Sequence, residues 1–409
     1  MPAQPTGEVP PLDGSLPASA GIGAADRGLS LYVHVPYCRV RCGYCDFNTY
    51  TAEDLGPGAS RDDYRGNLAR ELDLSVSTLA EAGAGDREVA TIFFGGGTPT
   101  LLEAEVLAGV MDDIRARFRL AADVEITTEA NPDTLDPAYI ATLAGAGFNR
   151  ISMGMQSAVP HVLATLDRTH DPKKIPEVAR WVKEAGLELS LDLIYGTPGE
   201  SIEDWRRSLD VALANEVDHI SAYSLIVEPG TKMGAMVRRG QLSMPDEDDL
   251  ADKYEIADAA MTAAGLHWYE VSNWSTGEKT RCEHNMAYWR NADWWGYGPG
   301  AHSHVGGVRF WNAKHPRAWA DRLLAGQSPS IGREVLDAGT REIERIMLAA
   351  RIDGELRLET LAPGSQQAIR TFVKQGLLDH DAAEDGWFQP TLQGRLLADH
   401  MVRILTEYV

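Results

Sequence analysis

Three cysteines lie close together near the start of the chain, at Cys38, Cys42 and Cys45. Their CxxxCxxC spacing follows directly after an apolar run, Leu31–Val35, that predicts a β-strand. Three thiolates on one short loop can ligate three irons of a cubane cluster and leave the fourth iron open to an exchangeable ligand. The spacing differs from that of paired zinc hooks and of ordinary ferredoxins. Since the only other cysteine is the distant Cys282, the sequence predicts a 4Fe-4S cluster with one open iron.

The composition limits the class of protein. The chain has 409 residues, of which 44% are hydrophobic and 24% charged, as is usual for a globular protein of two or three domains. A net charge of −22 argues against nucleic acid or an anionic membrane surface as a partner, because phosphate contacts need clustered Lys and Arg. The four cysteines suit a reducing cytoplasm, and no stretch has the ~18 apolar residues of a transmembrane segment. Residues 1–28 are rich in Pro, Gly and Ala and lack a signal-peptide pattern, so we expect a disordered extension.

From residue 29 onward, short β-rich runs alternate with amphipathic stretches of helical period. The expected strands are Leu31–Val35, Val89–Phe94, Val124–Thr128, Arg150–Met155, Leu187–Ile194 and His219–Leu225, and the helices between them include Asp63–Leu79, Ala104–Phe118, Pro137–Ala146, Lys174–Ala185 and Ile202–Ala214. Such an alternation predicts a parallel sheet with right-handed crossovers, and a doubly wound open sheet would share it. Polar motifs fall at the ends of successive strands, where a barrel places its active site. We therefore expect an α/β fold, a partial (β/α)6 barrel over residues 29–267.

After residue 267 the alternation stops. Residues 268–330 hold seven of the ten tryptophans and are expected to form an aromatic-rich connecting segment. Residues 331–409 predict a small, mainly helical C-terminal domain. Its expected elements are a helix over Thr340–Ala350, up to two helices over Leu358–Gln375, a hairpin from 376 to 390 and a closing helix over Leu392–Leu405. This order is winged-helix-like, but the tail is not basic, so we expect it to pack on the barrel rather than to bind DNA.

Polar motifs follow or end the second to fifth expected strands. The glycines of Gly95–Pro99 let a ligand approach the backbone and expose N–H donors, although a tight turn alone would also need them. Later strands lead to Glu129, to Gln156 and, inside an apolar run, to Asp192. A carboxylate buried in such a strand needs hydrogen bonds. Together with Arg168, these side chains are expected at one rim beside the cysteine loop.

These motifs resemble those of radical SAM proteins of the oxygen-independent coproporphyrinogen oxidase superfamily, in which S-adenosylmethionine (SAM) binds the open iron. Within that superfamily the chain is most similar to the HemW family of heme chaperones, from about Leu31 to the C-terminus. It departs from the oxidases at Phe47, where their CxxxCxxCxC pattern has a cysteine. It shares with the chaperones an HNxxYW motif, from His284 to Trp289. Residues 1–28 also do not resemble the segment that covers the porphyrin site of the oxidases, so the resemblance argues against coproporphyrinogen decarboxylation.

The resemblance implies a radical SAM partial barrel with a HemN-type C-terminal domain, a 4Fe-4S cluster on Cys38, Cys42 and Cys45, and SAM chelating the fourth iron. It implies a set of SAM contacts, namely Tyr32, Tyr44, Gly96, Gly97, Thr98, Glu129, Gln156, Arg168, Asp192 and Ile226. Arg168 suits the SAM carboxylate because a guanidinium binds a carboxylate through two parallel hydrogen bonds. Glu129 and Asp192 suit hydroxyls or an ammonium, and Ile226 suits the adenine.

His284 is the first candidate for a heme ligand. A neutral imidazole suits iron, and the surrounding tryptophans and tyrosines suit a flat apolar macrocycle. A hydrogen-bonded histidine in an aromatic core is the alternative. Cys282 is a rival ligand or attachment point, although the sequence has no CxxCH motif for c-type attachment. His34, His302 and His304 are further candidates.

Three functions are compatible with these features. The first is a cytoplasmic heme chaperone that holds one heme and passes it to an acceptor protein, for example a membrane-bound respiratory enzyme. The second is a radical SAM enzyme that cleaves SAM reductively and decarboxylates coproporphyrinogen III. The third is a binding module whose cluster is only structural.

Overall fold

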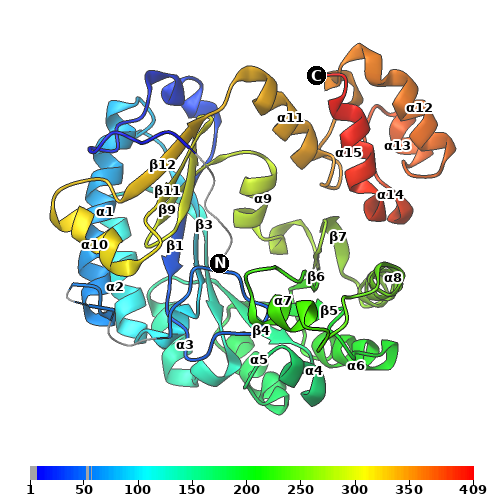
Figure 1. Cartoon of the computed structure of the whole chain (residues 1–409), viewed down its shortest axis with the longest axis horizontal. Coiled ribbons are helices and arrows are strands. Elements are labelled where there is room, and N and C mark those ends of the chain that lie inside the picture. The colour runs from blue at the N-terminus through cyan, green and yellow to red at the C-terminus, as the bar shows by residue number, and fades with distance from the viewer. Residues whose placement is uncertain (1–6, 52–54, 57) are drawn as a thin grey trace.

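A single twelve-stranded sheet organises the computed structural model, which describes residues 7–51, 55–56 and 58–409 (Figure 1). Its strand order is β12-β11-β10-β9-β1-β2-β3-β4-β5-β6-β8-β7. The six strands predicted by the alternation are parallel neighbours in chain order: β1 (Leu29–Val35), β2 (Val89–Gly96), β3 (Leu120–Ala130), β4 (Arg150–Gln156), β5 (Glu188–Tyr195) and β6 (His219–Ser224). The sheet curves without closing, which confirms the partial barrel.

Helices connect these strands and cover the outside of the sheet (Figure 1). They are α1 (Arg61–Glu81), α2 (Ala104–Arg115), α3 (Pro137–Gly145), α4 (Pro160–Thr165), α5 (Ile175–Glu184) and α6 (Ile202–Leu213). Capping fixes where several begin: the hydroxyls of Ser60 and Ser201 accept hydrogen bonds from the backbone N–H three residues on, as in a capping box. Two further helices, α7 (Lys232–Arg238) and α8 (Glu247–Ala263), follow β6.

The aromatic segment extends the sheet at both edges and is not the connecting segment that the sequence suggested. β7 (His267–Glu270) and β8 (Asn273–Ser275) add to the β6 edge, and β9 (Asp293–Tyr297) pairs in parallel with β1. β10 (His302–Val305), β11 (Val308–Asn312) and β12 (Ser330–Val335) follow in antiparallel order. Gly306 and Gly307, both at positive φ, form the two-residue β10–β11 turn. These strands are short, so the alternation of apolar and polar residues along them is weak. The α-helix α9 (Glu283–Trp289) lies between β8 and β9, and α10 (Pro316–Leu324) lies between β11 and β12.

The prediction of a disordered extension is wrong for residues 7–28, while residues 1–6 lie outside the described part of the chain. Glu8 bridges the backbone of Arg333 in β12, and Ala20 and Ala24 are buried in the main core. Gly306 leaves room for this segment, since a Cβ there would meet the Ala20 carbonyl oxygen at 2.1 Å. Small residues look disorder-prone by composition, but here they permit close packing on the sheet edge.

The C-terminal residues form a mainly helical unit with its own hydrophobic core, centred on Ile346, Phe372, Phe388 and Leu405. Its helices are α11 (Ala338–Ala349), α12 (Gln366–Lys374), α13 (His380–Glu384), α14 (Leu392–Leu396) and α15 (Ala398–Thr406). The expected closing helix is thus split at Leu397, and the expected hairpin is reduced to a single bridge between Leu378 and Pro390. In the described ranges, no helix combines the length and apolar character needed to cross a bilayer.

Candidate functional site

A cavity of about 350 Å³ lies inside the barrel, beside the cysteine loop. Its walls come from alternate residues of the parallel strands, because side chains two positions apart face the same side of a sheet. The strand residues that line it include Tyr32, Phe93, Thr127, Glu129, Arg150, Ser152, Gly154, Gln156, Ser190, Asp192, Ile194, His219, Ser221 and Tyr223. Its volume falls in the range of small-molecule sites.

All three clustered cysteines line this cavity. Their sulfurs do not converge on one point: among the described residues, the group that could hold a single ion within 4.8 Å lies elsewhere. A cubane cluster needs no such convergence, since it offers a separate iron to each thiolate. Burial raises the pKa of the Cys38 thiol to about 11 and raises the pKa of Cys45. Thiolates in this environment need positive charge nearby, which the irons of a cluster supply, so the residues fit the predicted group.

The glycine-rich turn after β2 packs against the cysteine loop. A Cβ at Gly97 would meet the Tyr37 carbonyl oxygen at 2.4 Å, and Gly96 lies at a φ of +107°. The N–H groups of Gly97 and Thr98 donate to the carbonyls of Val35 and Tyr37, both at 2.8 Å. These N–H donors are therefore already used within the chain, and the glycines serve close packing rather than an exposed anion cradle.

Arg168 extends from the loop after α4 to the cysteine loop. Its Nη2 donates to the Asn131 Oδ1 at 2.5 Å and to the Gly154 carbonyl at 2.8 Å, and its Nη1 lies 3.7 Å from the Cys42 sulfur. Asn131 in turn donates to the Thr98 hydroxyl at 3.3 Å. The guanidinium is thus fixed beside a cluster cysteine, with further N–H donors left for an anionic ligand.

Two half-buried carboxyl groups, those of Glu129 and Asp192, face the cavity. Burial, reinforced by the nearby Asp192, raises the pKa of Glu129 to about 8, against the effect of a 3.0 Å hydrogen bond from the Gly96 N–H. Burial also raises the pKa of Asp192, opposed by hydrogen bonds from Ser221 and Ser152. Ser152 donates to Asp192 at 3.0 Å. Both carboxyls therefore have hydrogen-bonding capacity for polar groups of a ligand.

The HNxxYW motif forms α9, which faces the same cavity. The backbone N–H of His284 donates to Glu125 at 3.1 Å, which fixes the start of this helix on β3. Thr91 gives its hydroxyl proton to Ser30, so the His284 Nδ1–H donates to Thr91 at 2.7 Å and its Nε2 accepts from the Tyr288 hydroxyl at 2.8 Å. Burial lowers the pKa of His284 to about 3. His284 is therefore neutral, with both ring nitrogens hydrogen-bonded.

The structure brings together all but one of the site residues that the resemblance implies. Tyr32, Tyr44, Gly96, Gly97, Thr98, Glu129, Gln156, Arg168, Asp192 and His284 all line the cavity with the three cysteines. Ile226 does not line it and is 68% exposed in the loop after β6. Gln156 has a φ of 60°, an uncommon value outside glycine that often marks functional sites.

Several residues that line the cavity were not predicted from the sequence. They include Asn131, Arg150, Ser152, Ser190 and Ser221. A period of two could have found three of them, since Asn131 and Ser190 lie two positions from Glu129 and Asp192, and Ser152 lies four positions from Gln156. Arg150 is 2% exposed, pairs with Glu188 at 2.6 Å and is held by backbone carbonyls of 280 and 281.

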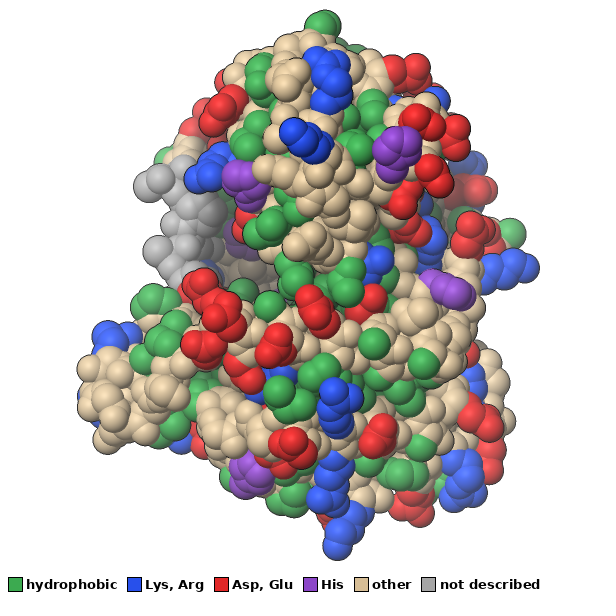
Figure 2. Space-filling view, turned by 90° about the vertical axis from the view of Figure 1, so that its right-hand side faces the viewer, with side chains coloured by type: hydrophobic (Ala, Val, Ile, Leu, Met, Phe, Trp, Pro, Cys, Tyr) green, Lys and Arg blue, Asp and Glu red, His purple; other side chains and the backbone are tan. Residues whose placement is uncertain are grey.

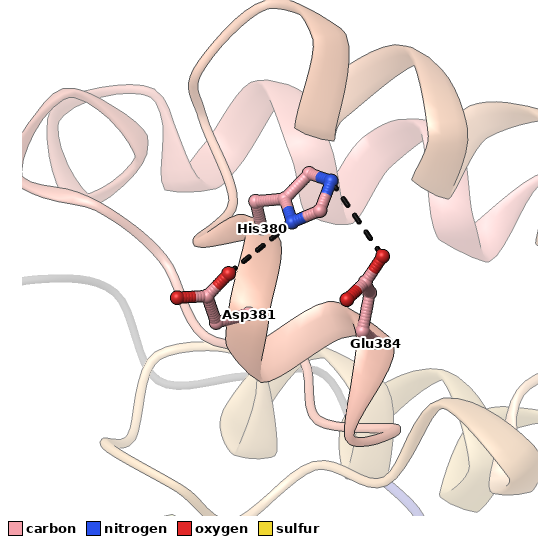
Figure 3. Close-up of side chains that lie close together, drawn as sticks. All are labelled: His380, Asp381 and Glu384. Atoms are coloured by element: carbon pink, nitrogen blue, oxygen red, sulfur yellow. Dashed lines mark hydrogen bonds and ion pairs between the residues drawn. The ribbon is translucent and has the colours of Figure 1, made fainter.

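One other group of possible metal ligands occurs in the described residues: His380, Asp381 and Glu384 on α13 (Figure 3). His380 contacts Asp381 at 3.3 Å and Glu384 at 3.8 Å. All three side chains are exposed, and such surface clusters are common without an ion. We assign no site to them.

An open parallel barrel with a three-cysteine loop at the carboxyl ends of its strands defines a radical SAM protein. Residues 32–212 match the Radical SAM superfamily. The structure is similar to that of coproporphyrinogen III oxidase (HemN) from Escherichia coli, with a TM-score of 0.78 over 96% of this chain and 92% of that one, at 22% identity. A likeness at this identity concerns the fold.

Relatives of much higher identity define the family. The chain is 46% identical to the heme chaperone HemW of Mycobacterium tuberculosis, over 92% of this chain and 94% of that protein. It is 39% identical to the heme chaperone HemW of Escherichia coli over 73% of this chain and 78% of that protein, and 37% identical to that of Bacillus subtilis over 72% and 76%. The chain belongs to the HemW family.

Proposed function

We propose that this chain binds heme and transfers it to an acceptor protein, on a radical SAM scaffold that carries a 4Fe-4S cluster with exchangeable SAM. The observation that carries the proposal is its 46% identity, over nearly the whole length of both chains, to a protein named as a heme chaperone.

In this proposal Cys38, Cys42 and Cys45 would hold the cluster at the mouth of the barrel cavity. The cluster with SAM supplies redox chemistry when bound. The role of the chain is to orient SAM: Arg168 would take its carboxylate, and Glu129 and Asp192 would accept hydrogen bonds from its polar groups. Tyr32, Tyr44 and Gln156 would complete the walls. The glycines and Thr98 would keep the cysteine loop against the strand ends.

One local feature, at Phe47, favours a carrier over a decarboxylase. Phe47, which replaces the extra cysteine of the oxidase pattern, is 57% exposed and lines the cavity mouth, so it offers apolar surface to a flat ligand. On the face in Figure 2, acidic side chains are spread over barrel and helical part, with basic side chains scattered between them. We propose a protein acceptor, for example a membrane-bound respiratory enzyme. The free clustered cysteines suit the cytoplasm.

A turnover assay separates the carrier from the enzyme. Reconstituted, anaerobic protein is incubated with SAM, a reductant and coproporphyrinogen III, and the porphyrin products and 5′-deoxyadenosine are quantified. The proposal predicts no decarboxylated porphyrin, together with saturable hemin binding by the same preparation. Decarboxylation with matching formation of 5′-deoxyadenosine would replace the carrier by the enzyme.

A further inference from the structure

A second cavity, of about 530 Å³, adjoins the first. It lies on the same concave face of the sheet, where β9, β10 and β11 continue beyond β1, and α11 of the C-terminal unit closes it from the other side. The residues that line it include Trp294, His302, His304, Arg309, Met347 and Leu348. Tyr32, Phe47 and Tyr288 line both cavities, so the two sites share an aromatic wall.

The lining of this cavity suits a flat, mostly apolar ligand. The ring centroids of Trp294 and His304 lie 4.9 Å apart, and those of Tyr288 and Trp294 lie 4.8 Å apart. Arg309 and Glu344, the charged residues of the lining, form an ion pair at 2.7 Å. Because their charges compensate, a macrocycle could enter with its charged edge toward solvent.

His304 is a buried histidine of this cavity, and one of its ring nitrogens lacks a hydrogen-bond partner. Its side chain is 3% exposed, and its Nδ1 lies 3.2 Å from the carbonyl oxygen of Ala292. A carbonyl only accepts, so Nδ1 carries the proton and Nε2 carries a lone pair. That Nε2 is buried and has no hydrogen-bond partner. An unpartnered buried acceptor is destabilising, and a bound ligand would remove that cost.

This arrangement is the one that metal-binding histidines use. A ligating imidazole commonly donates its other N–H to a backbone carbonyl, which fixes the tautomer and the ring orientation. Burial also lowers the pKa of His304, which keeps the ring neutral. His284 differs, because Tyr288 donates to its Nε2 at 2.8 Å and would have to move before a metal could bind.

We propose that the second cavity is a heme-binding site in which the Nε2 of His304 ligates the heme iron, with the macrocycle between Trp294 and α11. The inference rests on the proposed function, since it presumes that the chain binds heme. Nε2 is enclosed, so the cavity wall must rearrange to admit the ring. Met347, an unbranched and adaptable side chain, lies in that wall. The shared aromatic wall then places the heme next to the SAM site.

The test is an anaerobic hemin titration of the full, cluster-loaded chain, followed in the Soret band. The variants are His304→Ala, His284→Ala and, as control, His267→Ala in β7 at the opposite edge of the sheet. We expect His304→Ala to weaken binding about tenfold or more and to shift the Soret maximum, as loss of an iron ligand does, while the other two variants bind like wild type. In His304→Gly, added imidazole is expected to restore the wild-type spectrum. Iron, sulfide and SAM binding report whether each variant is folded.

The outcomes separate the two proposals. If wild type does not bind hemin, the proposed function fails and this site fails with it. If His284→Ala abolishes binding and His304→Ala leaves it unchanged, the chain binds heme but the second cavity is not the site. Equal binding by all variants also overturns the site. Weakened binding in both variants supports the site only if imidazole rescues His304→Gly, and absence of rescue overturns it. If His304→Ala fails to fold, His304→Met replaces it, with an altered axial-ligand spectrum as the expected result and an unchanged spectrum as the contradicting one.

Discussion

Replacing Arg168 by alanine should weaken SAM binding while leaving the cluster in place. The guanidinium is fixed by Asn131 and the Gly154 carbonyl, and it lies 3.7 Å from the Cys42 sulfur, where the carboxylate of SAM would reach it. A hydrogen bond to a charged group contributes about 1.5–3 kcal/mol, so loss of one such contact corresponds to a roughly ten- to hundredfold rise in Kd. Arg168→Lys retains the positive charge but loses the planar guanidinium that can form two parallel hydrogen bonds. Its Kd for SAM should therefore lie between that of wild type and that of Arg168→Ala.

The assay is equilibrium SAM binding to reconstituted protein, by calorimetry or by the change in the cluster's spectrum. Lys232→Ala is the matched control, because Lys232 is a nearby cation that pairs with Asp167 at 2.8 Å on the surface. Iron and sulfide contents should equal those of wild type in all three variants. Unchanged SAM affinity in Arg168→Ala would refute the assigned role, and loss of iron in that variant would show that Arg168 supports the cluster instead.

The remaining predictions concern the cluster, the glycine turn and pH. Cys42→Ser should abolish the visible absorbance of the cluster and its bound iron, whereas Cys282→Ser, whose sulfur lies beside Glu125 on β3, should retain both; equal iron in both variants would contradict the ligand assignment. Gly97→Ala should lower iron incorporation, because its Cβ would meet the Tyr37 carbonyl at 2.4 Å, while Gly145→Ala meets nothing within 4 Å and should behave like wild type. Glu71 is a buried carboxyl in α1, and burial raises its pKa from 4.5 to about 8. Its contribution to stability is therefore complete below the unfolded pKa and is lost as pH rises from there to about 8. The Tm should therefore fall between about pH 5 and pH 8, and Glu71→Gln should flatten that fall; an identical slope in the variant would exclude this group as a cause.

The central barrel could be predicted from the sequence because its strands and helices are long and strongly periodic. The predicted first and last residues of the six strands agree with the observed ones to within about two residues. The exception is the start of β3, which lies earlier, at Leu120. The candidate SAM residues were found through motif resemblance, and all of them except Ile226 line one cavity in the structure. Period-two alternation on the same strands would have added Ser152 and Ser190, which are small polar residues with no motif of their own.

The parts that could not be predicted depend on long-range contacts. Nothing local in His302–Val305 or Val308–Asn312 indicates that they continue the barrel sheet, since their partners are β9 and β12. The defined structure of residues 7–28 likewise depends on contacts with β12 and the main core, which composition does not reveal. The hydrogen bonds of His284 and the unpartnered Nε2 of His304 are equally invisible to a motif.

The most direct test of heme carriage is the stoichiometry of hemin binding by the wild-type, cluster-loaded chain under anaerobic conditions. The account predicts a Soret band that rises linearly and saturates at one heme per chain, with heme then released to an apo-acceptor protein. Non-saturating binding, or no binding at all, would contradict it.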